Sequence, residues 1–70
     1  MNPSSRNKII RMKDVVWTTG LSRSSIYQKI ACNQFPKQVK LGARAVGWLL
    51  AEVNGWIDHQ IKVSRAGPDL

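Results

Sequence analysis

Two stretches in the first half of the chain carry apolar residues at helical spacing. In the first, the spacing i, i+3, i+4, i+7 predicts a helix over residues 12–18 whose buried face contains Met12, Val15, Val16 and Thr19. In the second, Ile26 and Ile30 define the inner face of a helix over residues 23–31. Trp17 lies outside the apolar face of the first helix. It therefore either covers the flank of the core or is exposed for a partner.

Residues 19–22 join these two helices. Gly20 can adopt the positive φ that ends a helix. Ser22 can cap the second helix by accepting a hydrogen bond from the backbone N–H of Ser24 or Ser25. A helix, a short turn that contains glycine and a second capped helix together predict a helix-turn-helix.

After the second helix, the period of the apolar residues changes to two. Asn33-Gln34-Phe35-Pro36 ends the helix, because proline biases the residue before it towards extended conformation. The following residues, 37–48, predict a two-stranded hairpin that turns at Gly42-Ala43-Arg44, and we call this hairpin the wing. Its inward or core-flanking side chains are expected to be Val39, Leu41, Val46 and Trp48.

A third amphipathic segment follows the wing and predicts a helix over residues 50–61. Its apolar stripe should pack on the first two helices and bring Trp48 and Trp56 into one cluster. At the other end of the ordered part, Ile9 and Ile10 form either a short strand or a hydrophobic staple onto the first helix.

These elements predict a mainly α fold, a winged helix-turn-helix of three helices and a two-stranded wing. The domain is expected over residues 9–62. We expect residues 1–8 to be a flexible basic arm and residues 63–70 to be a flexible tail.

Composition narrows the classes of function. A chain of 70 residues makes one small domain, so its three Trp are interpreted first as core. Cys32 is the single cysteine and His59 the single histidine, which excludes an internal disulfide and a four-ligand zinc site. The four acids are scattered, and no nucleophile–base pair or phosphate loop accompanies them. We therefore expect no enzyme, no metal, no cofactor and no small-molecule substrate.

The net charge of +7 and the sequence pI near 10.4 favour a polyanionic partner. Between Val15 and Ala51 the chain has no Asp or Glu, whereas it has five cations, Arg23, Lys29, Lys37, Lys40 and Arg44. This surface is positive in any fold, and we expect double-stranded DNA as its partner. No stretch approaches the ~20 apolar residues of a membrane span, so we expect a cytoplasmic protein, nucleoid-associated when DNA-bound, with no membrane partner.

The second helix and the wing supply the candidate DNA contacts. The outer face of the helix has small or amide-bearing side chains near its start, which suits entry into a major groove. Gln28 matches adenine, and Arg23 matches a phosphate or guanine. The wing offers cations to phosphates or to the minor groove. The expected DNA-binding residues are Arg23, Ser24, Ser25, Tyr27, Gln28, Lys37, Lys40 and Arg44. The alternative is an ordinary solvated surface on both elements.

Several segments at fixed separations together resemble the AlpA family of small prophage-encoded regulators, which belongs with excisionase and MerR-like winged helix-turn-helix domains. The matching segments are Met12-Lys13-Asp14-Val15-Val16, Thr19-Gly20-Leu21-Ser22-Arg23-Ser24-Ser25-Ile26-Tyr27, Phe35-Pro36-Lys37, Val39 to Trp48, Glu52-Val53 and Trp56-Ile57. The resemblance covers about residues 10–57. It implies a DNA-binding transcriptional regulator of a prophage or other integrated element, acting on an integrase promoter, with a recognition helix at residues 23–30 and a wing at residues 40–46.

Three alternatives stay open. The first is an excisionase, a recombination directionality factor without a promoter role. The second is a small basic protein-interaction module that uses Trp17 and the Leu49-Leu50 patch. The third, a membrane-surface peptide, is disfavoured because the cations surround a turn-rich middle rather than line one long amphipathic helix. Two departures from the family pattern, at Trp17 and at residues 49–51, add apolar surface and indicate self-association on DNA or contact with a second protein.

Overall fold

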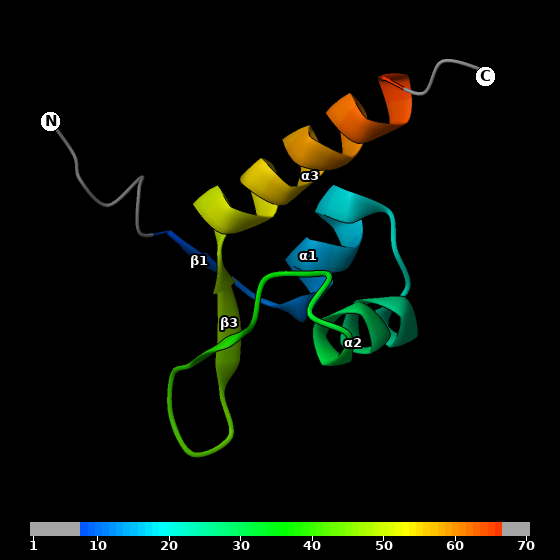
Figure 1. The fold of residues 1–70 in the computed structure, drawn as a ribbon. Coiled ribbons are helices and arrows are strands. Elements are labelled where there is room, and N and C mark those ends of the chain that lie inside the picture. Colours follow the sequence, from blue (N-terminus) through cyan, green and yellow to red (C-terminus); the bar gives the residue numbers. More distant parts are fainter. Residues whose placement is uncertain (1–7, 67–70) are drawn as a thin grey trace, which may run out of the picture.

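The computed structural model describes residues 8–66, so residues 1–7 of the expected arm and 67–70 of the expected tail lie outside the described part. The described residues form the predicted winged helix-turn-helix, with three helices and a small antiparallel sheet (Figure 1). In chain order the elements are β1 (Ile9–Ile10), α1 (Met12–Thr19), α2 (Arg23–Ala31), β2 (Val39–Lys40), β3 (Val46–Leu49) and α3 (Leu50–Arg65).

The turn between α1 and α2 has the predicted geometry. Gly20 has a φ of 77°, and its N–H donates to the carbonyl oxygen of Val16 at 2.9 Å. The Ser22 hydroxyl oxygen accepts from the N–H of Ser25 at 3.1 Å and so caps α2. Thr19 joins the end of α1 to the turn, because its hydroxyl donates to the Val15 carbonyl and accepts from the N–H of Leu21. These local bonds fix the angle at which α2 leaves α1.

The sheet has three strands in the order β1-β3-β2, one more than the predicted two-stranded wing. Ile9 and Ile10 adopt the strand alternative and pair with Leu49 and Trp48 of β3. On the other side of β3, Val39 pairs with Gly47 and Lys40 with Val46. The first strand therefore ties the wing to the body of the domain.

The register divides the apolar residues of the sheet between two faces, because paired residues point to the same side. Val46 and Trp48 face the core, as predicted. Val39 pairs with Gly47 and thus lies on the opposite face. Leu41 follows Val39 by two residues and is 46% exposed, so the assignment of Val39 and Leu41 to the inward or core-flanking set is wrong.

The core lies between α1, α2, the sheet and the first half of α3. Its fully buried side chains are Val15, Ile26, Trp48 and Val53, with Ile10 and Phe35 almost as buried. Trp48 also donates its indole N–H to the Pro36 carbonyl at 3.1 Å. Trp56 packs against this core but is only half-buried. The predicted cluster of the two tryptophans therefore has one central and one peripheral member.

The last helix is longer than predicted, since α3 continues to Arg65 rather than ending at Ile61. Residues 63–65, which were assigned to the tail, are helical and exposed. In Figure 1 this C-terminal half of α3 projects beyond α1. None of the described helices has the length and apolar character to cross a membrane.

Candidate nucleic-acid interface

A buried isoleucine and a serine cap hold the outer face of α2 in place. Ile26 is fully buried, and the Ser22 cap fixes the first turn of the helix. Ser24 and Gln28 lie opposite this anchor and are exposed. Arg23, at the start of the helix, is also exposed, and Tyr27 exposes 44% of its surface. The face thus presents hydroxyl, amide, phenol and guanidinium groups, all of which can bond to base edges or phosphates.

Ser25 differs from the other predicted contact residues of α2. It is partly buried, and its N–H donates to the Ser22 hydroxyl oxygen. The Ser22 hydroxyl in turn donates to the Ser25 hydroxyl oxygen at 3.0 Å. Ser25 is therefore engaged in the helix cap, and Ser24 is the more accessible of the two adjacent serines.

The end of α2 brings the chain back towards α3. Asn33 adopts a left-handed conformation with a φ of 59°, and its N–H donates to the Ile30 carbonyl at 3.0 Å. The N–H of Gln34 donates to the Lys29 carbonyl at 2.7 Å. The helix is thus closed by an asparagine, which tolerates this conformation, before the Phe35-Pro36 stop is reached.

The wing places its cations at the surface. Lys37, Lys40 and Arg44 are all exposed. Its loop is closed by two bonds to the Ala45 carbonyl, from the N–H of Leu41 at 2.7 Å and from that of Gly42 at 3.2 Å. The tip of the wing is therefore a defined turn rather than a free loop.

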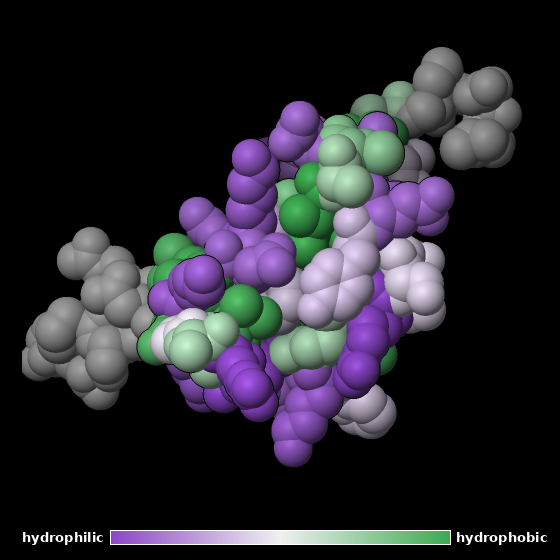
Figure 2. Space-filling view, turned by 90° about the horizontal axis from the view of Figure 1, so that it is seen from below, coloured by the Kyte–Doolittle hydropathy of each residue, from purple (hydrophilic) through white to green (hydrophobic). Residues whose placement is uncertain are grey.

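Figure 1 places α2 and the loop of the wing on the same side of the molecule, away from α3. Seen from that side, most of the surface is hydrophilic, with smaller hydrophobic areas among the polar groups (Figure 2). Two of the three acids among the described residues, Glu52 and Asp58, belong to α3, and the third, Asp14, is bonded to the N–H of Arg11 at the start of α1. The side that carries α2 and the wing is thus the cationic side.

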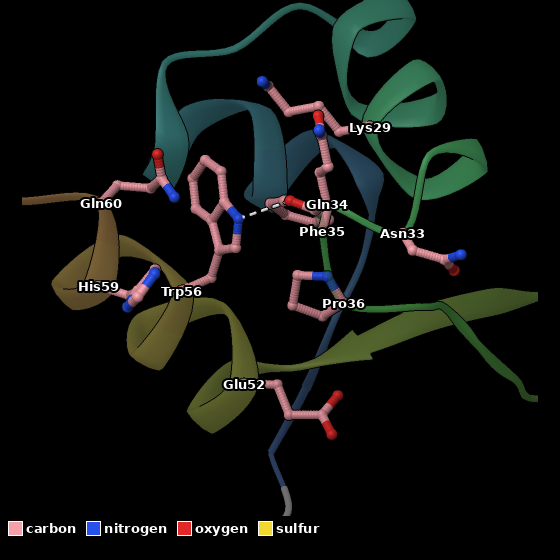
Figure 3. Close-up of a pocket in the computed structure, with 9 residues that line it drawn as sticks. All are labelled: Lys29, Asn33, Gln34, Phe35, Pro36, Glu52, Trp56, His59 and Gln60. Carbon is pink, nitrogen blue, oxygen red and sulfur yellow. Dashed lines mark hydrogen bonds between the residues drawn. The ribbon is translucent and has the colours of Figure 1, made fainter. Parts of the chain in front are cut away.

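Lys29 is the exception among the five cations of the acid-free stretch. It is partly buried and lines an open recess between the C-terminal end of α2 and α3 (Figure 3). In this recess the Trp56 indole N–H donates to the Gln34 carbonyl at 2.8 Å, and its ring meets Phe35 edge-on with centroids 4.8 Å apart. These contacts join the α2–β2 connection to α3, so the recess marks a structural joint.

The structure decides between the two interpretations of Trp17. Its side chain is 87% exposed on α1, so it does not cover the flank of the core. Helical geometry places Trp17 outside the apolar face and so favours exposure, whereas the expectation that a tryptophan of a small domain belongs to its core favours burial. Among the described residues, no group of three or more His, Cys, Asp or Glu could hold a metal ion.

Comparison with known proteins identifies relatives over almost the whole described region. The model of the family described as prophage CP4-57 regulatory protein (AlpA) matches residues 8–61. The chain is 33% identical over 69 residues to the DNA-binding transcriptional activator AlpA of Escherichia coli K12, covering 90% of this chain and 99% of that protein. It is 38% identical over 65 residues to the uncharacterized protein ORF88 of Enterobacteria phage P4, covering 93% of this chain and 74% of that protein.

Proposed function

Because the chain belongs to the AlpA family of prophage regulatory proteins, we propose that it is a sequence-specific DNA-binding regulator of transcription. The E. coli relative is named a DNA-binding transcriptional activator, and the similarity extends over nearly its whole length. In this proposal α2 enters the major groove of double-stranded DNA, and the wing contacts the DNA beside it.

The main support for the proposal is that α2 and the loop of the wing lie on the same side of the molecule (Figure 1). Arg23, Ser24, Tyr27 and Gln28 would meet base edges and phosphates, and Ser25 would support them through the cap. Lys37, Lys40 and Arg44 would neutralise phosphates next to the site that α2 reads. Backbone N–H groups at the start of a helix add a favourable position for a phosphate.

The target that we propose is the promoter of an integrase gene in the same integrated element. Footprinting on the DNA that surrounds the protein's own gene tests this. We expect protection over the integrase promoter, and no comparable protection on unrelated DNA of similar composition. Protection of an attachment site instead would favour an excisionase over a promoter regulator. Absence of any protected region on this DNA would contradict the proposed target.

Self-association on DNA is the second part of the proposal. Trp17 supports it, because a side chain that is 87% exposed offers apolar surface to a neighbouring molecule. The same footprint reports on it. A protected region that extends in regular steps as protein is added supports association of copies along the DNA, whereas one short protected site at all concentrations contradicts it.

A further inference from the structure

Leu41 occupies an unusual position on the wing. It follows β2, and its position two residues after Val39, the partner of Gly47, puts it on the sheet face opposite the core, where its side chain reaches over Gly47 of β3. A Cβ built at Gly47 would lie 3.3 Å from Leu41 Cδ1. The leucine side chain therefore rests on the one position of β3 without a side chain, and 46% of its surface stays exposed.

The loop that follows Leu41 holds this side chain in place. The N–H of Leu41 and that of Gly42 both donate to the Ala45 carbonyl, which closes the turn. Residues 42–44 protrude from this closed turn and are exposed. Arg44 thus sits at the tip of the wing, and Leu41 sits at the base of the same turn.

The residues near Leu41 in the sequence favour DNA as the molecule that covers its exposed side chain. The nearest charged residues in sequence are Lys37, Lys40 and Arg44, and the whole stretch from Val15 to Ala51 lacks an acid. The walls of a DNA groove consist of deoxyribose rings, which offer apolar C–H surface directly beside phosphates. An exposed leucine on a wing that also carries exposed cations matches that combination of surfaces.

From these observations we propose that Leu41 is a DNA-contacting residue, whose side chain packs against deoxyribose on the wall of the minor groove while Arg44 reaches phosphate or groove floor. The inference rests on the proposed function, because the wing lies beside a minor groove only when α2 occupies the neighbouring major groove. It adds an apolar contact to an interface predicted from polar and charged residues alone.

The salt dependence of binding distinguishes an apolar from a charged contact. Each cation that neutralises a phosphate contributes about 0.9 to the slope of log K against log salt, because counterions are released. Packing of a leucine on deoxyribose releases no counterion. Loss of the leucine should therefore lower affinity at every salt concentration by the same factor and leave the slope unchanged.

The test compares Leu41→Ser with Ile61→Ser. Ile61 is a matched control, because it is 42% exposed on α3, whereas all the predicted DNA contacts lie on α2 and the wing. Binding to a short labelled duplex carrying the footprinted sequence is measured by fluorescence anisotropy at several salt concentrations. We expect Leu41→Ser to raise Kd about tenfold, as expected for losing a buried part of a leucine side chain. Ile61→Ser should bind like the unchanged protein, and Leu41→Met should retain most of the affinity because it keeps an apolar side chain.

Hydroxyl-radical footprinting gives a second readout, because these radicals attack deoxyribose C–H bonds. Protection beside the α2 site should fade in Leu41→Ser while protection of the major-groove site persists. A Leu41→Ser protein that is folded by circular dichroism and binds with unchanged Kd would overturn the inference, as would equal losses in Leu41→Ser and Ile61→Ser. Failure of the unchanged protein to bind any duplex would instead contradict the proposed function, and the leucine contact with it.

Discussion

Gln28 and Arg23 are exposed on α2 while Ile26, between them in sequence, is fully buried. Their roles in an interface differ because their chemistry differs. An amide both donates and accepts, so Gln28 can bond two atoms of one base edge, whereas a wing cation such as Arg44 attracts every phosphate equally. Sequence choice should therefore depend on Gln28 and affinity on the cations.

Substitution of Gln28 by Ala tests this division of roles. We expect Gln28→Ala to weaken binding to the footprinted duplex by about 1 to 3 kcal/mol, the usual contribution of a bidentate base contact. Binding to a shuffled duplex of the same length should stay unchanged. Arg44→Ala is the control, and it should weaken binding to both duplexes by a similar factor. An equal loss on both duplexes for Gln28→Ala, measured in parallel anisotropy titrations, would contradict the base-reading role.

The three tryptophans illustrate which residue environments the sequence can predict. Trp48 alternates with Val46 along a strand, and this period was sufficient to predict its burial. Trp56 fits the apolar stripe of α3, but its position at the edge of the core depends on where residues 34–36 return to that helix. Trp17 lies outside the apolar face of α1, which favours exposure, but a tryptophan in a small domain is expected in the core, so the sequence left both alternatives open.

At the level of elements, boundaries were predicted well where local signals exist at both ends. The helix α2 has the predicted bounds because Ser22 caps its start, and the residues after Ala31 favour a turn. The helix α3 was predicted to end at residue 61 but continues to Arg65. No glycine or proline interrupts residues 61–66, and the cations Lys62 and Arg65 interact favourably with a helix C-terminus, so the sequence allowed the longer helix. The strand β1 is two residues long and depends on pairing with β3, a contact distant in sequence, so two alternatives remained for it.

The pairing of β1 with β3 depends on Gly47, and this gives a prediction for stability. A Cβ at Gly47 would lie 2.9 Å from the Ile10 carbonyl oxygen and would also meet the Ile9 side chain. Because backbone cannot move aside without breaking the strand pair, Gly47→Ala should lower the free energy of unfolding by about 1 to 3 kcal/mol. Urea unfolding followed by tryptophan fluorescence measures this change.

A matched control for Gly47→Ala lies in the same hairpin. A Cβ at Gly42 would meet nothing within 4 Å, and Gly42 does not have a positive φ. Gly42→Ala should therefore change the free energy of unfolding by less than about 0.5 kcal/mol, or raise it slightly by restricting the unfolded chain. Similar unfolding midpoints for the two variants would show that β3 does not need a glycine for its pairing with β1.

At the level of the whole molecule, the sequence predicted a positively charged surface for the middle of the chain. It did not predict which of the cations lie on the same side of the folded molecule. In the structure Arg23, Lys37, Lys40 and Arg44 are exposed on α2 and the wing, whereas Lys29 lines the recess beside Trp56. Helical position alone could not place Lys29, because the position of α3 relative to α2 depends on contacts between segments that are distant in sequence. The cationic surface is therefore somewhat smaller than the charge count predicted.

This distribution of charge leads to a prediction for the binding equilibrium of the whole domain. If four exposed cations of α2 and the wing neutralise phosphates, the slope of log K against log salt should be about −4, since each contributes about 0.9. Anisotropy titrations across a range of salt concentrations measure it, on both the footprinted and a shuffled duplex. The slope should be similar on both, because phosphates are common to all sequences, while the affinities differ. A slope near zero would mean that the acid-free surface does not meet the DNA backbone, and the interface would then have to lie elsewhere on the molecule.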